Sequence, residues 1–157
     1  MFSQQIDEAK LIHVLILRNP LSTSEYEHLL DRAYQLSLRA RARSEETLRV
    51  LLVIHGKEPV GALVRQRIGE VEDLAPRWDI AMVTPSVVSR TIMTAVAWLA
   101  PSNQLRRRVT CENPEEAIDW LVSRGAERKV LDEMFRRAWR EFETRGGKTT
   151  SAGSANP

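Results

Sequence analysis

The sequence contains a single cysteine and no long hydrophobic run. Cys111 alone cannot form an internal disulfide or a cysteine-based zinc cluster, and so little cysteine fits a reducing compartment, which predicts a cytoplasmic protein. No apolar stretch approaches the ~20 residues that cross a bilayer, so we expect no membrane insertion. The opening residues, MFSQQIDEAK, lack a basic segment followed by an apolar one, so no secretory signal is expected.

A strong charge of one sign is also absent. The 23 Lys and Arg residues are balanced by 21 Asp and Glu residues, which leaves a net charge of +2. Nucleic-acid-binding proteins concentrate basic residues on one face, so this balance argues against a nucleic-acid partner. A run of arginines, Arg106 to Arg108, lies in a predicted strand, where alternate side chains point to opposite faces, so the three cannot all reach one ligand.

Motifs of enzymes and nucleotide-binding proteins are missing too. The sequence has no GxGxxG, GxxxxGK[ST], GxSxG or HExxH pattern. His13 falls within a predicted strand and His28 within a predicted helix, and we expect both to be structural. Cys111 precedes a predicted helix, a location that can lower the pKa of a thiol, but a lone thiol without a basic neighbour is usually inert. The sequence therefore predicts no enzymatic activity, no cofactor and no metal site.

Short apolar segments alternate with amphipathic helical ones in this chain of 157 residues. The predicted strands are 2–6, 11–17, 48–54, 78–84 and 106–111. The predicted helices are 23–43, a helix from Pro59 that ends at Gly69 or continues toward Pro76, 87–100, 114–124 and 127–144. Ser22 with Glu25 and Asn113 with Pro114 are typical helix starts.

This alternation predicts an α/β fold with a mixed, mainly parallel central sheet flanked by helices on both faces. The antiparallel part is an N-terminal hairpin. We expect one α/β domain over residues 1–125, an additional C-terminal helix within 126–145, and a flexible polar tail over 146–157.

Ligands of open parallel sheets gather at the carboxyl ends of the strands, near a point where the strand order reverses. The candidate residues there follow two central predicted strands: His55, Gly56, Lys57 and Glu58, and then Ser86. His55 and Glu58 could form an acid–base pair, or this segment could simply be a turn before a helix. Ser86 could help to hold an anion at a helix N-terminus, or it could simply cap the helix.

The predicted helix 127–144 carries an apolar stripe that includes Met134 and Phe135. The α/β domain is complete near Gly125, which leaves two alternatives for this stripe. It could pack back on the domain, or it could present an apolar surface to a protein partner or to a second copy in a homodimer. Met134 and Phe135 are therefore further candidates for partner binding.

Three segments, together with the order of elements, resemble the SpoIIAA-like branch of the STAS superfamily. They are LSTSEYEHLL, RWDIAMVTP with VVSRTIMTAVAWLAP, and VTCENPEEAIDWLVSRGA. This superfamily consists of bacterial α/β domains that are also grouped with the Sec14-like lipid-binding fold. The resemblance runs from Leu11 to Gly125, about three quarters of the chain. It implies a mixed sheet, a regulatory or binding role, and no chemistry of its own.

The better-known STAS members antagonise anti-sigma factors through a phosphorylatable serine or threonine at the start of the second helix. The matching stretch here, HGKEPV from His55 to Val60, contains no hydroxyl residue, so the resemblance implies no phosphorylation switch at this position. We therefore expect a non-enzymatic regulatory module that binds a protein partner. The alternative is a small-ligand or lipid-like carrier or sensor of the Sec14-like type.

Overall fold

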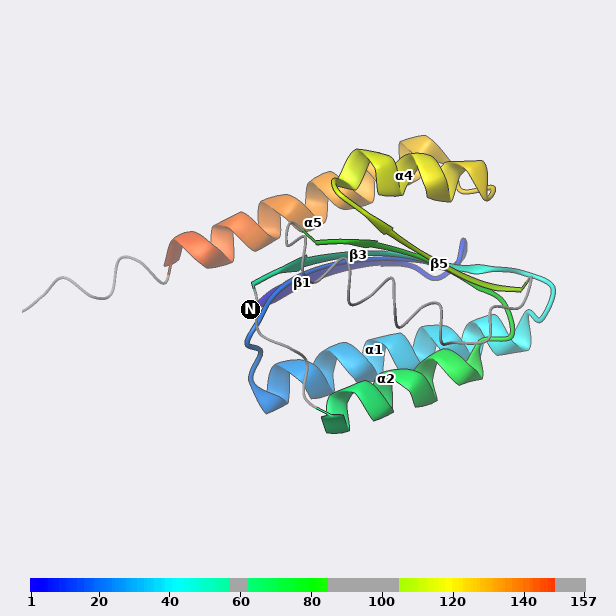
Figure 1. Cartoon of the computed structure of the whole chain (residues 1–157), viewed down its shortest axis with the longest axis horizontal. Helices are drawn as coiled ribbons and strands as arrows, with labels where there is room; N and C mark the ends of the chain where they lie inside the picture. Colours follow the sequence, from blue (N-terminus) through cyan, green and yellow to red (C-terminus); the bar gives the residue numbers. More distant parts are fainter. Residues whose placement is uncertain (57–61, 85–104, 149–157) are drawn as a thin grey trace, which may run out of the picture.

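Five strands form one sheet in the order in which they occur in the sequence, β1-β2-β3-β4-β5 (Figure 1). This computed structural model describes residues 1–56, 62–84 and 105–148. The elements are β1 (Phe2–Asp7), β2 (Ile12–Arg18), α1 (Thr23–Ala42), β3 (Leu48–His55), α2 (Ala62–Leu74), β4 (Trp78–Val83), β5 (Arg106–Cys111), α4 (Pro114–Ser123) and α5 (Arg128–Lys148). The predicted helix 87–100 lies outside the described residues.

The sheet is mixed, as predicted, because β1 runs antiparallel to β2 while β2 to β5 are parallel to one another. Each right-handed crossover advances by one strand, which places α1 and α2 on the same face. After β5 the chain passes to the opposite face of the sheet, which α4 and α5 cover (Figure 1). The strand order therefore never reverses among the described strands, so the expected switch point for ligands is absent there.

Local sequence signals set several helix ends. The Ser22 side chain accepts a bond from the Glu25 amide, and the Glu25 carboxylate accepts one from the Ser22 amide, which completes the predicted capping box. Asn113 caps α4, and Pro114 occupies its first turn. Gly125 ends this segment with a φ of +91°, a left-handed conformation that glycine adopts without strain.

Two glycines do not end helices. Gly69 lies inside α2, which continues to Leu74, so the longer of the two predicted helices is present. No atom lies within 4 Å of a Cβ built at Gly69, so the helix passes this residue without a packing constraint. Gly146 lies inside α5, which continues to Lys148 and so extends into the segment predicted as a tail.

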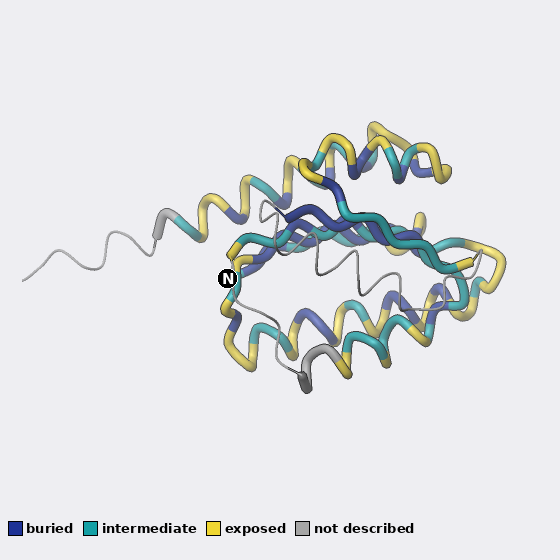
Figure 2. Tube along the Cα trace, viewed as in Figure 1, coloured by how far each residue is buried: buried dark blue, intermediate teal, exposed yellow. Residues whose placement is uncertain are grey.

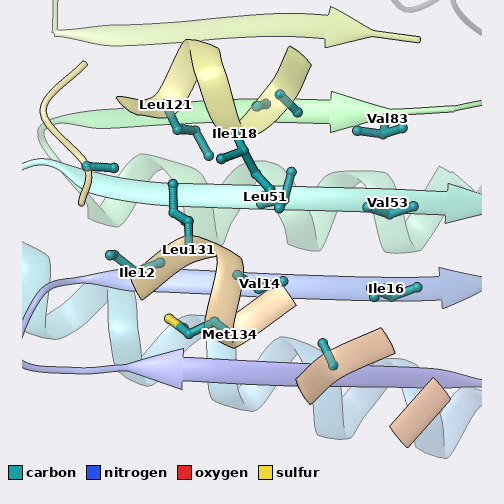
Figure 3. Close-up of a cluster of buried hydrophobic side chains, with 14 of the residues drawn as sticks. Ile12, Val14, Ile16, Leu51, Val53, Val83, Ile118, Leu121, Leu131 and Met134 are labelled. Atoms are coloured by element: carbon teal, nitrogen blue, oxygen red, sulfur yellow. The ribbon is translucent and has the colours of Figure 1, made fainter. Parts of the chain in front are cut away.

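Alternating side chains of the sheet build a core on each face. The core under α4 and α5 joins strand residues such as Val14, Ile16, Leu51 and Val83 to helix residues such as Leu121, Leu131, Met134 and Phe142 (Figure 3). A second core joins Leu15 and Leu17 to α1 through Leu29 and Leu30. Each fully buried leucine stabilises the fold by about 2 kcal/mol through removal of apolar surface from water.

The helices bury one side and expose the other (Figure 2). The buried part of the apolar stripe of α5, which includes Met134, packs against β1, β2 and α4, as in the first of its two predicted alternatives. Leu131 and Ala138 are fully buried there. This helix is therefore part of the folded domain.

The arginine run of β5 divides between the two faces, as predicted. The three ion pairs are Arg106 with Asp73 at 3.0 Å, Arg107 with Asp79 at 2.6 Å, and Arg108 with Glu72 at 2.6 Å. Asp79 is fully buried, and Arg107 donates to both of its carboxylate oxygens. The Arg107 guanidinium serves the fold, because the buried carboxylate of Asp79 needs a partner.

Candidate functional site

His55 lies at the carboxyl end of β3, opposite Arg18 at the end of β2. Gly56 follows with a φ of +99°, and a Cβ built there would lie 2.9 Å from the backbone oxygen of Asn19. Only glycine fits this close approach of two chain segments. The turn therefore fixes the direction in which the chain leaves the sheet after His55. Lys57, Glu58 and Ser86 lie outside the described residues.

The imidazole of His55 packs into an aromatic cluster on α5. Its ring stacks on Phe142 with centroids 5.4 Å apart, and it lies 5.7 Å from the ring of Trp139. Trp139 in turn lies 5.8 Å from the ring of Phe135. We call His55, Phe135, Trp139 and Phe142 the aromatic cluster. Through Trp139 it connects two predicted site residues, His55 and Phe135, that are far apart in the sequence.

The aromatic cluster carries one positive group at its edge. The Arg18 guanidinium lies over the Phe142 ring, 5.4 Å from its centroid, a cation–π contact. Burial lowers the pKa of His55, and the charge of Arg18 lowers it further. The imidazole is therefore neutral near neutral pH. Its buried Nε2 atom has no hydrogen-bond partner among the described residues.

Cys111 also ends a strand at this edge, but its thiol is buried. Burial raises the pKa of this thiol, and the nearby Glu116 carboxylate raises it further. This shift is opposite to the lowering that the helix N-terminus could have produced. Cys111 is therefore a core residue and not a nucleophile at neutral pH.

A groove lies next to the aromatic cluster on the outer surface. It is lined by Pro114 at the start of α4 and by four residues of α5, namely Phe135, Arg136, Trp139 and Arg140. The groove has a volume of about 630 Å³ and is open to solvent. We call it the α4–α5 groove. Its floor is apolar, because the rings of Phe135 and Trp139 are only partly buried by the core.

Two arginines border this floor. Arg136 Nε donates to the Asp132 carbonyl at 3.1 Å, and Arg140 Nε donates to the Arg136 carbonyl at 3.4 Å. Neither guanidinium forms an ion pair with any carboxylate in the part of the chain that the structure describes. By contrast, Arg137 pairs with Glu133 one turn away. The groove therefore combines partly exposed aromatic rings with two positive charges that have no ion-pair partner among the described residues.

The two predicted site residues on α5 have different positions. Met134 is 9% exposed and points into the core between α5 and the sheet (Figure 3). Its neighbour Phe135 is rotated by about 100° around the helix and lines the groove. Of this pair, Phe135 alone is accessible to a partner while α5 stays packed.

Sequence reasoning missed most of the groove. Phe135 with Trp139 and Arg136 with Arg140 are both i, i+4 pairs, which share a helix face. That spacing was the available signal. It predicts an aromatic stripe and a basic stripe side by side, but it cannot show whether another helix covers them.

Metal ligands do not gather in this structure: residues 1–56, 62–84 and 105–148 contain no group of three His, Cys, Asp or Glu side chains that could hold an ion. Within these ranges no helix is long and apolar enough to span a membrane. No family model, no curated protein and no solved structure matches the chain.

Proposed function

We propose that this protein is a non-enzymatic regulatory module that binds a protein partner in the α4–α5 groove. The observation that carries the proposal is the partly exposed aromatic floor of Phe135 and Trp139, which runs beside Arg136 and Arg140 on the same helix. Tryptophan and arginine are the residues that most often dominate binding energy at protein interfaces. Large apolar side chains left on a surface with a positive rim are typical of a docking site.

The charges of the groove indicate the chemistry of the partner. An amphipathic helix that docks in a groove presents apolar anchors about one turn apart, which matches the i, i+4 spacing of Phe135 and Trp139. Arg136 and Arg140 lack acidic partners among the described residues, so carboxylates that flank those anchors would form ion pairs with them. The proposed partner segment is therefore an acidic amphipathic helix.

The cluster behind the groove supports this role. Trp139 rests on His55 and Phe142, which hold its ring in one orientation. A pre-organised aromatic anchor loses little conformational entropy on binding. His55 thus contributes to the proposed site as a neutral packing residue and not as an acid or base.

The proposal includes the SpoIIAA-like resemblance and a cytoplasmic location. The mixed sheet and the order of the described elements support the resemblance. In this view the partner contacts a surface on α5, beyond the segment that resembles the family. Regulation would then depend on docking alone, because HGKEPV offers no hydroxyl group for phosphorylation.

A carrier of the Sec14-like type would enclose its ligand in a deep apolar pocket. The α4–α5 groove is open, and the second large hollow, which lies along β1, is mostly polar. Binding of a small lipid is therefore the alternative outcome of the test and not a second proposal.

The test selects binders from a displayed library of random peptides of about 15 residues, long enough for an amphipathic helix. We expect enrichment of acidic amphipathic sequences. The double variant Arg136→Gln/Arg140→Gln should weaken the best peptide roughly ten-fold or more, because two ion pairs are lost. The control Arg128→Gln/Arg137→Gln changes the net charge equally but leaves the groove intact.

Equal affinity of the two double variants would contradict the proposal. So would a selection that enriches no acidic amphipathic sequence. Saturable binding of a fluorescent fatty acid, with no peptide enriched, would instead favour the carrier alternative.

A further inference from the structure

The first strand, β1, lies at one edge of the sheet formed by the described strands. β1 is outermost in the strand order and pairs only with β2 among the described strands. The Arg18 amide donates to the Met1 carbonyl at 2.9 Å, which makes these two residues a hydrogen-bonded pair of the antiparallel ladder. Because such pairs alternate along a strand, the N–H and C=O groups of Phe2, Gln4 and Ile6 point away from β2.

One of these outward groups already has a partner. The Arg145 guanidinium on α5 donates to the Phe2 carbonyl at 2.6 Å. The structure gives the outward groups of Gln4 and Ile6 no partner within the residues it describes. Edge strands that natural proteins leave unpaired in this way can accept a further strand.

A hollow of about 690 Å³ lies along this edge. It is lined by β1 at Phe2 and Gln4, by α1 at Ser24, Glu25, His28 and Arg32, and by α5 at Glu141 and Arg145. Since α1 and α5 cover opposite faces of the sheet (Figure 1), one hollow with walls from both must follow the edge of β1. We call it the β1-edge groove.

Among the charged side chains on the α1 wall of this groove, the one without an ion-pair partner in the described residues is positive. Glu25 is occupied by its own helix cap and by the N-terminal amine at 3.0 Å. Glu141 accepts bonds from Ser3 Oγ at 3.0 Å and from Gln5 Nε2 at 2.8 Å. Arg32 forms no ion pair with a carboxylate in the described part of the chain.

We propose that the β1-edge groove is a second binding site, which takes an extended acidic segment of a protein partner as a sixth strand of the sheet. The backbone of that segment pairs with the outward groups of Gln4 and Ile6, the mode known as β-strand addition. Its alternate side chains face opposite walls. Carboxylates meet Arg32 on the α1 wall, and neutral side chains meet Glu141 on the α5 wall.

A second copy of this chain fits the edge less well. Two β1 strands paired antiparallel about Gln4 would bring both Arg32 side chains to the same stretch of groove, where like charges repel. The charges therefore favour an acidic peptide over self-association. This site is on the other side of the molecule's α5 helix from the α4–α5 groove, and the inference does not depend on the function proposed above.

The test uses a labelled peptide in which threonine and aspartate alternate, titrated against the full chain, with hydrogen exchange read at single residues. Binding should slow exchange at the Gln4 and Ile6 amides, while Ser3 and Gln5 are already protected by β2. The variant Gln4→Pro removes the outward N–H without removing a bond to β2. It should weaken binding at least ten-fold relative to Gln4→Ala, which removes the same glutamine side chain but keeps the backbone N–H.

Several results would overturn the inference. These are unchanged exchange at Gln4 and Ile6 at saturating peptide, equal affinity of the Gln4→Pro and Gln4→Ala proteins, or slowed exchange without peptide together with a doubled solution mass. The variant Arg136→Gln/Arg140→Gln should bind this peptide normally, so failure of one site is distinguishable from failure of the other.

Discussion

Acidification should destabilise the fold through His13, whose side chain is only 4% exposed within β2. Its Nε2 atom lies 3.1 Å from Gln4 Oε1, a hydrogen bond that the neutral imidazole can make. Burial lowers the pKa of His13 to about 4, and the charge of Arg32 acts in the same direction. The folded protein thus holds this imidazole neutral well below its ordinary pKa of 6.5.

The sign and size of the effect follow from proton linkage. Between pH 6.5 and pH 4 the unfolded state binds a proton at His13 and the folded state does not, so stability is lost as the pH falls through this window. The full difference in pKa corresponds to about 3 kcal/mol, and about 2 kcal/mol of it is lost between about pH 7 and pH 5.

The assay is urea unfolding followed by circular dichroism across this pH range, with His13→Gln as the comparison. Glutamine stays neutral, so the variant should lose about 2 kcal/mol less stability than the natural chain between about pH 7 and pH 5. Other titrating groups, including His55, are present in both proteins and cancel in the difference. The same loss of stability in both proteins would refute the reasoning.

Three further substitutions should change the stability of the fold. Arg107→Leu should lower the free energy of unfolding in urea by about 3 kcal/mol, because it leaves the buried Asp79 carboxylate without its ion pair. Adding Asp79→Leu should restore much of this loss. Additive effects of the two substitutions would contradict the pairing. Gly56→Ala should cost about 2 kcal/mol, because of its positive φ and the 2.9 Å approach of a Cβ to the Asn19 carbonyl. Gly69→Ala, with no atom within 4 Å of its Cβ, should instead raise stability by about 1 kcal/mol, and equal effects of the two substitutions on the melting temperature would count against both explanations.

Local sequence patterns predicted most of the fold. Apolar segments identified the strands, and their alternation with helical segments predicted the parallel part of the sheet. The caps at Ser22 and Asn113 identified two helix starts. These signals act over a few residues, so they can be read without knowing the fold. The end of α2 was ambiguous, because Gly69 is tolerated inside a helix when nothing packs against it.

The site was less predictable because it depends on long-range packing. His55 ends β3 and Phe135 lies on the last helix, and no pattern shows that Trp139 joins them. The face that α5 covers also depends on the strand order. Each strand from β2 to β5 is added on the same side of the one before it, which leaves the face opposite α1 and α2 for α5. Because this order does not reverse among the described strands, the switch point expected for ligands is absent there. The sequence could not show that the groove is open to solvent, because this depends on which elements pack against α5.

The most direct test of the proposed function is the indole N–H resonance of Trp139 during titration with the peptide selected for the α4–α5 groove. Trp78, which packs with α1 residues on the opposite face of the sheet, is the internal reference. We expect the Trp139 signal to shift in proportion to bound peptide while the Trp78 signal stays in place. Saturable binding that leaves the Trp139 resonance unmoved would contradict the account.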